Sequence, residues 1–338
     1  MASAPSGGSS GGKPRGSVRE VKQVQLDGSV VLKIIKHCQE EGSGSEWVTG
    51  CLVGVVVDET LEISNCFPFP KDSTDNPREE IEYQKNVLKK LRTVNVDYHE
   101  VGWYQSTYLG SHVSREFLEA HVGYQRAIQE SVVLIYDPLQ TSRGALSLKA
   151  YRLTPQILTM MGASDPFTPE SVQQARVVHS DVLVELPVTL RSSRLTSVLL
   201  QELPKSTTLP SNALLGLSST ELLQKNVQLL MENVESLQLE TYRLLGYEKN
   251  ISKQAQQKQQ FLQRRREENE RREKTGEPPL PMTDEAIEQE SSLKPVVPPQ
   301  RLEALLIGEQ VDLRCQQISE IAGAAFAKLY LAEGLQPN

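Results

Sequence analysis

Histidine and cysteine are the residues of this 338-residue chain that could most readily bind a metal ion or act in catalysis. The five histidines are His37, His99, His112, His121 and His179, and no two have H-x-H or H-x-x-x-H spacing. The four cysteines are Cys38, Cys51, Cys66 and Cys315, without a C-x-x-C pair. This spacing predicts no metal site and no cofactor, and it suits a reducing compartment.

One short stretch nevertheless has the form of a catalytic loop. Residues 101–107, VGWYQST, resemble the zinc loop of the MPN domain family, whose catalytic members are the JAMM metalloproteases. In those enzymes G-W-Y leads into H-S-H, and the two histidines bind one zinc ion. The resemblance places Gln105 and Thr107 at the two histidine positions.

The other catalytic positions of the MPN family also differ in this chain. The resemblance implies that a later Ser-x-x-Asp pair is replaced by Arg115 and Leu118, and that Trp47 stands at the position of the general base. A hydrolytic zinc site needs about three protein ligands and a bound water, and amide or hydroxyl oxygens replace imidazoles poorly. We therefore expect a non-catalytic domain without zinc. A metal-dependent isopeptidase with a displaced site is the remote alternative.

Composition and charge restrict the partners of the chain. The formal net charge is −7, so no overall attraction to nucleic acid or to an anionic membrane is expected. No segment approaches 18 consecutive apolar residues, and the first residues lack the apolar core of a signal peptide. These features predict a soluble cytoplasmic protein that does not enter a membrane.

The first part of the chain alternates between helix and strand patterns. Residues 1–20 are rich in Ser, Gly and Pro and predict a disordered tail. Residues 21–192 predict an α/β domain with a mixed sheet, in which WVTGCLVGVVV and TLEISNCF form a hairpin and DVLVELPVTLR closes the domain. The MPN resemblance adds that the sheet is curved and flanked by helices.

Long helical patterns follow the α/β domain. Residues 193–273 contain a heptad seam that is apolar up to Leu244, apart from Thr241, and mixed beyond it. A Pro-rich linker at 274–300 and a bundle helix at 301–335 complete the chain. The candidate partner-binding residues on these helices are Leu223, Val227, Leu230, Val234, Leu237, Leu244, Ile318, Ala322, Ala325 and Leu329.

A charged run, QQKQQFLQRRREENERREK, ends the heptad helix. Its interleaved acids and bases are typical of a solvated helix, and direct contact with ribosomal RNA or with a charged partner is the alternative.

Several longer strings point to one family. VVLKIIKHCQEE, NCFPFP, ESVVLIYDP, SLKAYRLTP and GEPPLP, together with the altered zinc loop, resemble the h-subunit family of eukaryotic translation initiation factor 3. The resemblance implies a scaffold that pairs through its MPN domain with the f subunit, another MPN subunit, and through its C-terminal helices with PCI subunits. It also implies binding of the small ribosomal subunit through the complex, with roles in scanning and reinitiation. The alternative is a non-catalytic MPN subunit of the proteasome lid or the COP9 signalosome.

Overall fold

The computed structural model describes residues 21–41, 47–70, 77–142, 146–162, 167–206, 220–276, 278 and 296–334. The tail predicted at 1–20 and most of the linker predicted at 274–300 lie outside this part of the chain. The chain divides into two compact units. The first contains Met1–Tyr108, Gly123–Arg152 and Glu185–Leu209, and the second contains Leu109–Val122, Leu153–Val184 and Pro210–Asn338.

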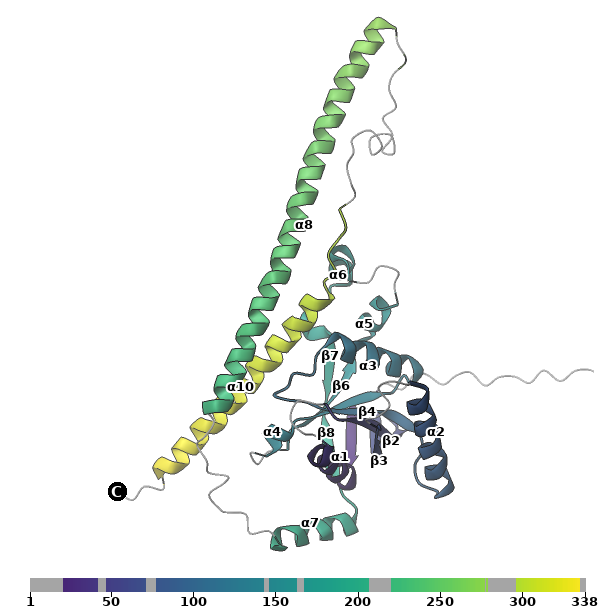
Figure 1. Ribbon diagram of the computed structural model, residues 1–338, viewed down its shortest axis with the longest axis vertical. Coiled ribbons are helices and arrows are strands. Elements are labelled where there is room, and N and C mark those ends of the chain that lie inside the picture. Colours follow the sequence, from purple (N-terminus) through teal and green to yellow (C-terminus); the bar gives the residue numbers. More distant parts are fainter. Residues whose placement is uncertain are drawn as a thin grey trace, which may run out of the picture. The chain divides into compact units, whose positions relative to one another are not determined.

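A mixed sheet of eight strands, in the order β7-β6-β5-β4-β2-β3-β1-β8, is the centre of the fold (Figure 1). The strands are β1 Gln23–Asp27, β2 Thr49–Val57, β3 Thr60–Pro68, β4 Glu100–Ser106, β5 Val132–Tyr136, β6 Leu148–Leu153, β7 Leu183–Leu186 and β8 Val188–Arg191. Strand β1 runs parallel to β3 and β8, and β4 runs parallel to β5, whereas β2 is antiparallel to β3 and β4. The predicted α/β class with a mixed sheet is confirmed.

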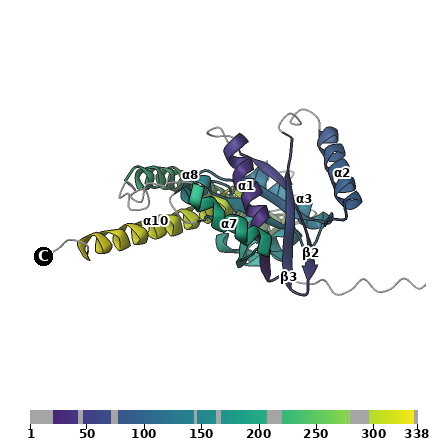
Figure 2. The same ribbon diagram turned by 90° about the horizontal axis from the view of Figure 1, so that it is seen from below.

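Two helices cover opposite faces of β2 and β3 (Figure 2). Helix α1 (Gly28–Glu41) begins after Asp27, whose Oδ1 accepts a hydrogen bond of 2.8 Å from the backbone N–H of Ser29. Its apolar stripe, including Ile34, is buried in the main core. Helix α2 (Pro77–Thr93) packs its own apolar face on the other side of the sheet, against Cys51, Val53 and Phe67.

The end of the α/β domain differs from the expectation of one closing strand. Pro187 separates β7 from β8, and these two strands form opposite ends of the sheet order. Proline has no N–H to donate to a strand ladder, so the pairing breaks there. The Pro187 carbonyl instead accepts a hydrogen bond of 3.0 Å from Val24 N.

Shorter helices connect these strands. They are α3 Arg115–Ala127, α4 Pro138–Thr141, α5 Pro155–Met160, α6 Pro169–Ala175, the 3-10 turn η2 His179–Asp181, and α7 Arg194–Ser206. Threonine side chains cap α5 and α6, and each of these helices begins with a proline.

Two long helices, α8 (Thr220–Thr275) and α10 (Leu302–Gly334), lie side by side in the second unit (Figure 1). Helix α8 has 56 residues and continues beyond the heptad seam through Gln, Glu, Lys and Arg, which are all good helix formers. No helix in the described part of the chain has the length and apolar character needed to cross a membrane.

Candidate functional site

The stretch that resembles a zinc loop ends β4 in the first unit. Gln105 and Thr107 are only 3% and 4% exposed, and within the described residues Gln105 Nε2 and Thr107 Oγ1 have no hydrogen-bonding partner. The backbone here is fixed from both sides, since Thr107 N donates to Tyr136 O at 2.8 Å and Ser106 Oγ accepts from Val48 N at 2.8 Å. These positions therefore present a buried amide and a buried hydroxyl in place of imidazoles.

The other positions implied by the MPN resemblance also lack metal-binding groups. Trp47 precedes β2 and is 42% exposed. In the second unit, Leu118 is buried, and the exposed guanidinium of Arg115 donates to Glu119 Oε1 at 2.8 Å. An indole, an isobutyl group and a cation cannot act as the base or the oxygen ligand of a zinc hydrolase.

Among the described residues, no group of three or more His, Cys, Asp or Glu side chains could hold a metal ion. His37 takes part in a buried structural network, with Nδ1 at 2.8 Å from the Tyr104 hydroxyl and Nε2 at 2.9 Å from Glu41 Oε2. Burial raises the pKa of the Cys38 thiol to about 11 and of Cys66 to about 12, so these thiols stay protonated near neutral pH.

The heptad seam on α8 is covered on one side only. Leu230, like Leu223, Leu237 and Leu244, is half-buried, whereas Val227 and Val234 are 40% and 49% exposed. The buried residues Leu222 and Asn226 lie to one side of the predicted seam. The buried face of α8 is thus turned about the helix axis away from the predicted seam. Val227, Met231 and Val234 are left as an exposed apolar stripe.

Helix α10 divides into a buried half and an exposed half. Leu302, Leu306 and Leu313 are buried within the second unit. The predicted contact residues Ile318, Ala322 and Ala325 are half-buried, and Leu329 is exposed. Phe326, Tyr330 and Leu331 are exposed as well. The C-terminal half of α10 therefore offers apolar side chains that could pack against another helix.

Arg314 of α10 is a buried anchor that sequence reasoning missed. Its guanidinium donates to the Leu109 carbonyl, to Ser111 Oγ and, at 3.2 Å, to Asn226 Oδ1 of α8. One turn earlier, Gln310 Nε2 donates to Val113 O at 2.5 Å. These bonds join α10 both to α8 and to segment 109–113. An arginine in a helical sequence is normally expected to be exposed to solvent. The feature of the sequence that could have indicated a buried polar contact was the amide of Asn226, which lies beside the apolar seam.

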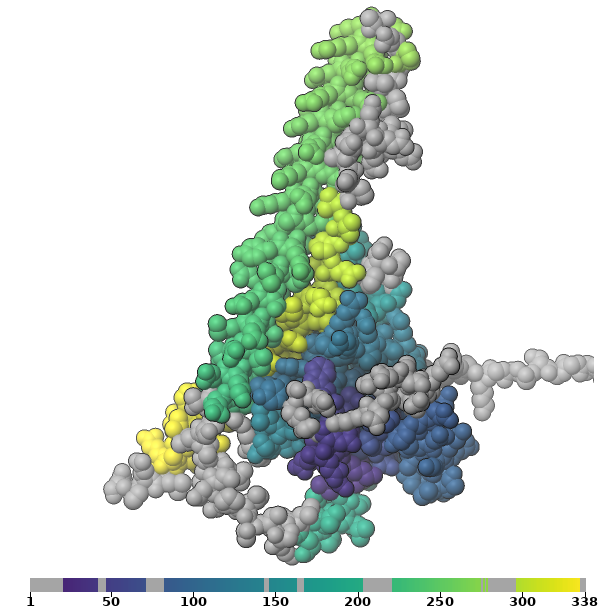
Figure 3. All heavy atoms as spheres, in the orientation of Figure 1, coloured from purple at the N-terminus to yellow at the C-terminus, as the bar shows by residue number. Residues whose placement is uncertain are grey.

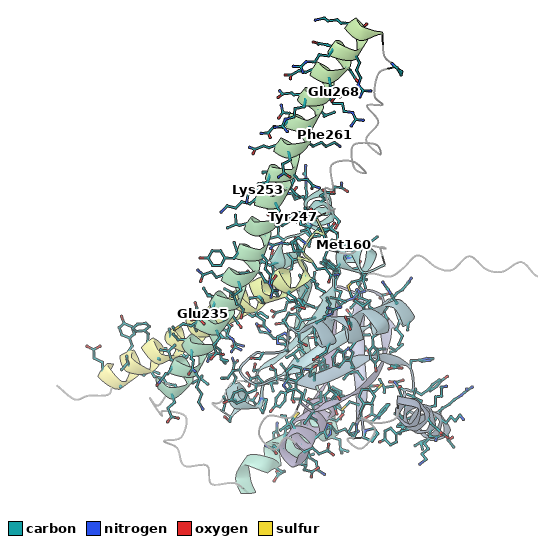
Figure 4. All side chains as sticks on the ribbon, turned by 45° about the horizontal axis from the view of Figure 1, so that its top comes forward. Met160, Glu235, Tyr247, Lys253, Phe261 and Glu268 are labelled. Atoms are coloured by element: carbon teal, nitrogen blue, oxygen red, sulfur yellow. The ribbon has the colours of Figure 1, made fainter. Side chains whose placement is uncertain are left out.

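The distal part of α8 is polar on most of its surface. Figure 3 shows its side chains in rows along the helix, and Figure 4 marks Lys253, Phe261 and Glu268 among them. The Arg265 guanidinium lies 5.5 Å from the centre of the Phe261 ring, and Arg272 pairs with Glu268 at 3.4 Å. Acids and bases alternate here as in a solvent-exposed helix.

The fold and the altered loop define an MPN-domain protein that carries long C-terminal helices. The family model described as JAB1/Mov34/MPN/PAD-1 ubiquitin protease matches residues 19–130, and the model for the C-terminal region of eIF3h matches residues 141–338, more than half of the chain. The chain belongs to the eIF3h family, the H subunits of eukaryotic translation initiation factor 3, and it is a translation initiation factor subunit.

Three relatives support this assignment. The H-B subunit of eukaryotic translation initiation factor 3 from Danio rerio is 46% identical over 318 residues, which cover 94% of each chain. The H subunit from Xenopus tropicalis is 47% identical over 94% of this chain and 93% of its own. The H subunit from Nematostella vectensis is 43% identical over 98% of each chain.

Proposed function

We propose that this protein is a non-catalytic scaffold subunit of cytoplasmic translation initiation factor 3. In this role its MPN domain pairs with the f subunit, a second MPN subunit, and its C-terminal helices join PCI subunits in a helical bundle. The assembly would bind the small ribosomal subunit and support scanning and reinitiation. The uncovered apolar stripe on α8 is the observation that carries the proposal, because such a surface is normally buried against a partner.

The altered zinc loop supports a binding role for the MPN domain. All five positions that the resemblance assigns to metal binding and catalysis hold other residues, namely Trp47, Gln105, Thr107, Arg115 and Leu118. Gln105 and Thr107 are buried, and an amide or a hydroxyl replaces an imidazole ligand poorly.

We expect the double substitution Gln105→His and Thr107→His to leave the protein inactive as an isopeptidase. Two imidazoles alone supply neither a third ligand nor a general base, so hydrolysis of ubiquitin chains should stay at background. Metal analysis of the unsubstituted protein should give less than ~0.1 zinc per chain. Measurable hydrolysis by the double variant, or near-stoichiometric zinc in the parent protein, would contradict the non-catalytic assignment.

The helical surface can be tested without disturbing the chain's own packing. Val234→Asp places a carboxylate in the exposed stripe, where burial against a partner would strand an unpaired charge at a cost of several kcal/mol. We expect Val234→Asp to reduce recovery of the PCI subunits in pull-downs from cells by about tenfold or more. Gln228→Asp is the matched control, because it introduces the same carboxylate at an exposed position of α8 outside the stripe.

Equal recovery of PCI subunits with both variants would exclude the stripe as the bundle surface.

Mass spectrometry of the same pull-downs also separates the assemblies that use MPN subunits. Initiation factor subunits are expected, and recovery of proteasome-lid or signalosome subunits in their place would refute the assignment to initiation factor 3.

A further inference from the structure

A cluster of titratable groups lies where the first half of α10 meets the 3-10 turn η2 in the second unit. The two elements approach closely at Gly308, since a Cβ atom there would lie 2.9 Å from the Cβ of His179. One turn further along α10, Asp312 Oδ2 lies 2.8 Å from His179 Nε2. The imidazole therefore spans one turn of α10 and ends against a carboxylate.

Glu309 lies between Gly308 and Asp312 in the sequence of α10. It is only 7% exposed, and its Oε2 has no hydrogen-bonding partner among the described residues. The charged groups that act on its carboxyl are Asp312 on the same helix, and His179 and Asp181 on η2. Burial, reinforced by Asp312, raises the pKa of Glu309 to about 7 against the opposing effect of His179.

Among the described residues, no charged group other than Asp312, His179 and Asp181 acts on the Glu309 carboxyl. Arg115 of α3 acts on Glu303, six residues before Glu309. On α8, the first three partly buried residues after Asn226 are Leu229, Leu230 and Asn233, and none of them carries a charge. The cluster does not suggest a metal site, because no group of three or more His, Cys, Asp or Glu side chains in the described part of the chain could hold a metal ion.

We propose that Glu309, His179 and Asp312 form a proton-dependent latch that holds α10 on η2, tightening as the pH falls and loosening as the pH rises through neutrality. This inference goes beyond the scaffold role and does not depend on it.

The direction of the pH effect follows from the Glu309 carboxyl. A carboxyl with a raised pKa in the docked state keeps a proton that it loses when α10 is released, so its stabilising effect disappears as the pH rises from about 4.5 to about 7. The 2.8 Å contact between His179 Nε2 and Asp312 Oδ2 holds η2 against the same turn of α10. Docking of α10 on η2 therefore weakens as the pH rises.

Hydrogen–deuterium exchange of the full chain at pH 6 and pH 8 tests the latch, with labelling times scaled to the intrinsic exchange rate. Peptides from 302–313 should show about tenfold more opening at pH 8, as expected for one carboxyl whose pKa shifts from about 7 to about 4.5 on release. Glu309→Gln should remove most of this increase. Glu320→Gln, on an exposed part of α10, should leave it unchanged.

A second variant keeps the test decisive if Glu309→Gln is insoluble. Asp312→Asn removes one of the two carboxylates that add to the effect of burial on the Glu309 pKa, and it also changes the partner of His179. Asp312 is half exposed, so the change is expected to be tolerated. It should make the pH effect smaller than in the parent protein, because burial of Glu309 remains but the Asp312 charge is gone. Equal exchange of the parent protein at both pH values, or a full tenfold effect in Glu309→Gln or Asp312→Asn, would overturn the latch.

Discussion

A chain that ends at Arg301 should lose most of its stability, because it lacks α10. The buried half of that helix contributes Leu302, Leu306 and Leu313, and burying three leucines stabilises a fold by roughly 5–9 kcal/mol. The truncation also removes the donors that satisfy Leu109 O and Val113 O. The total is comparable with the stability of a whole domain, so we expect poor solubility and no cooperative thermal unfolding.

The matched control is a chain that ends at Ser319. It keeps Arg314 and the buried half of α10 but lacks the exposed apolar residues beyond, such as Phe326 and Tyr330. Its melting temperature should stay within a few degrees of the full chain, at about 4 °C or less per kcal/mol lost. If the chain ending at Arg301 melted like the chain ending at Ser319, the first half of α10 would not be part of the folded core.

Gly102→Ala should destabilise the MPN sheet by about 3–5 kcal/mol. Gly102 has φ 151°, a conformation that side chains disfavour, and a Cβ there would lie 1.9 Å from the Val132 carbonyl oxygen on the neighbouring strand β5. Backbone strain and overpacking each contribute about 1–3 kcal/mol or more. Chemical denaturation monitored by circular dichroism would measure the loss.

Gly123→Ala provides the comparison for this glycine. Gly123 lies within α3, and a Cβ there meets no atom within 4 Å. Because alanine favours helix over glycine, the variant should be as stable as the parent or about 1 kcal/mol more stable. A Gly102→Ala protein with unchanged stability would show that β4 and β5 can separate without cost. The glycine of the G-W-Y motif is thus expected to serve the sheet and not a metal site.

Much of the fold was predictable, because local patterns and burial agree in the α/β domain. Val30 and Ile34 have the spacing of one helix face, and Asp27 is a residue type that favours a helix start, so α1 is predictable from the sequence. The uninterrupted apolar run VVLIY is typical of a strand buried on both faces, and β5 is buried along its whole length. The splitting of the last strand was missed, although Pro187 was visible in the sequence.

The candidate surface was predicted in part. Heptad spacing gave the existence of α8 and the position of Leu230 on a partly buried face. The heptad spacing could not predict that the buried face of α8 is centred closer to Asn226, because apolar periodicity contains no information about buried amides and charges. Arg314 and Glu309 were missed for the same reason, since both are stabilised or perturbed by residues far away in the sequence. The assignment of Val227 and Val234 to partner contacts stays a prediction.

The separation of β7 and β8 by Pro187 also limits how other proteins can engage the sheet. Eight strands laid flat would extend about 34 Å from the first to the last, at about 4.8 Å per step. Leu186 is the last residue of β7 and Val188 is the first residue of β8, and these two strands lie at opposite ends of the sheet order. Only Pro187 separates the two residues, so their Cα atoms can be no more than about 7 Å apart. The sheet must therefore curl until its borders nearly meet, as in a barrel. Each border is a strand of four residues, too short to recruit a foreign strand effectively, so binding partners should be selected by side chains on helices and not by backbone pairing.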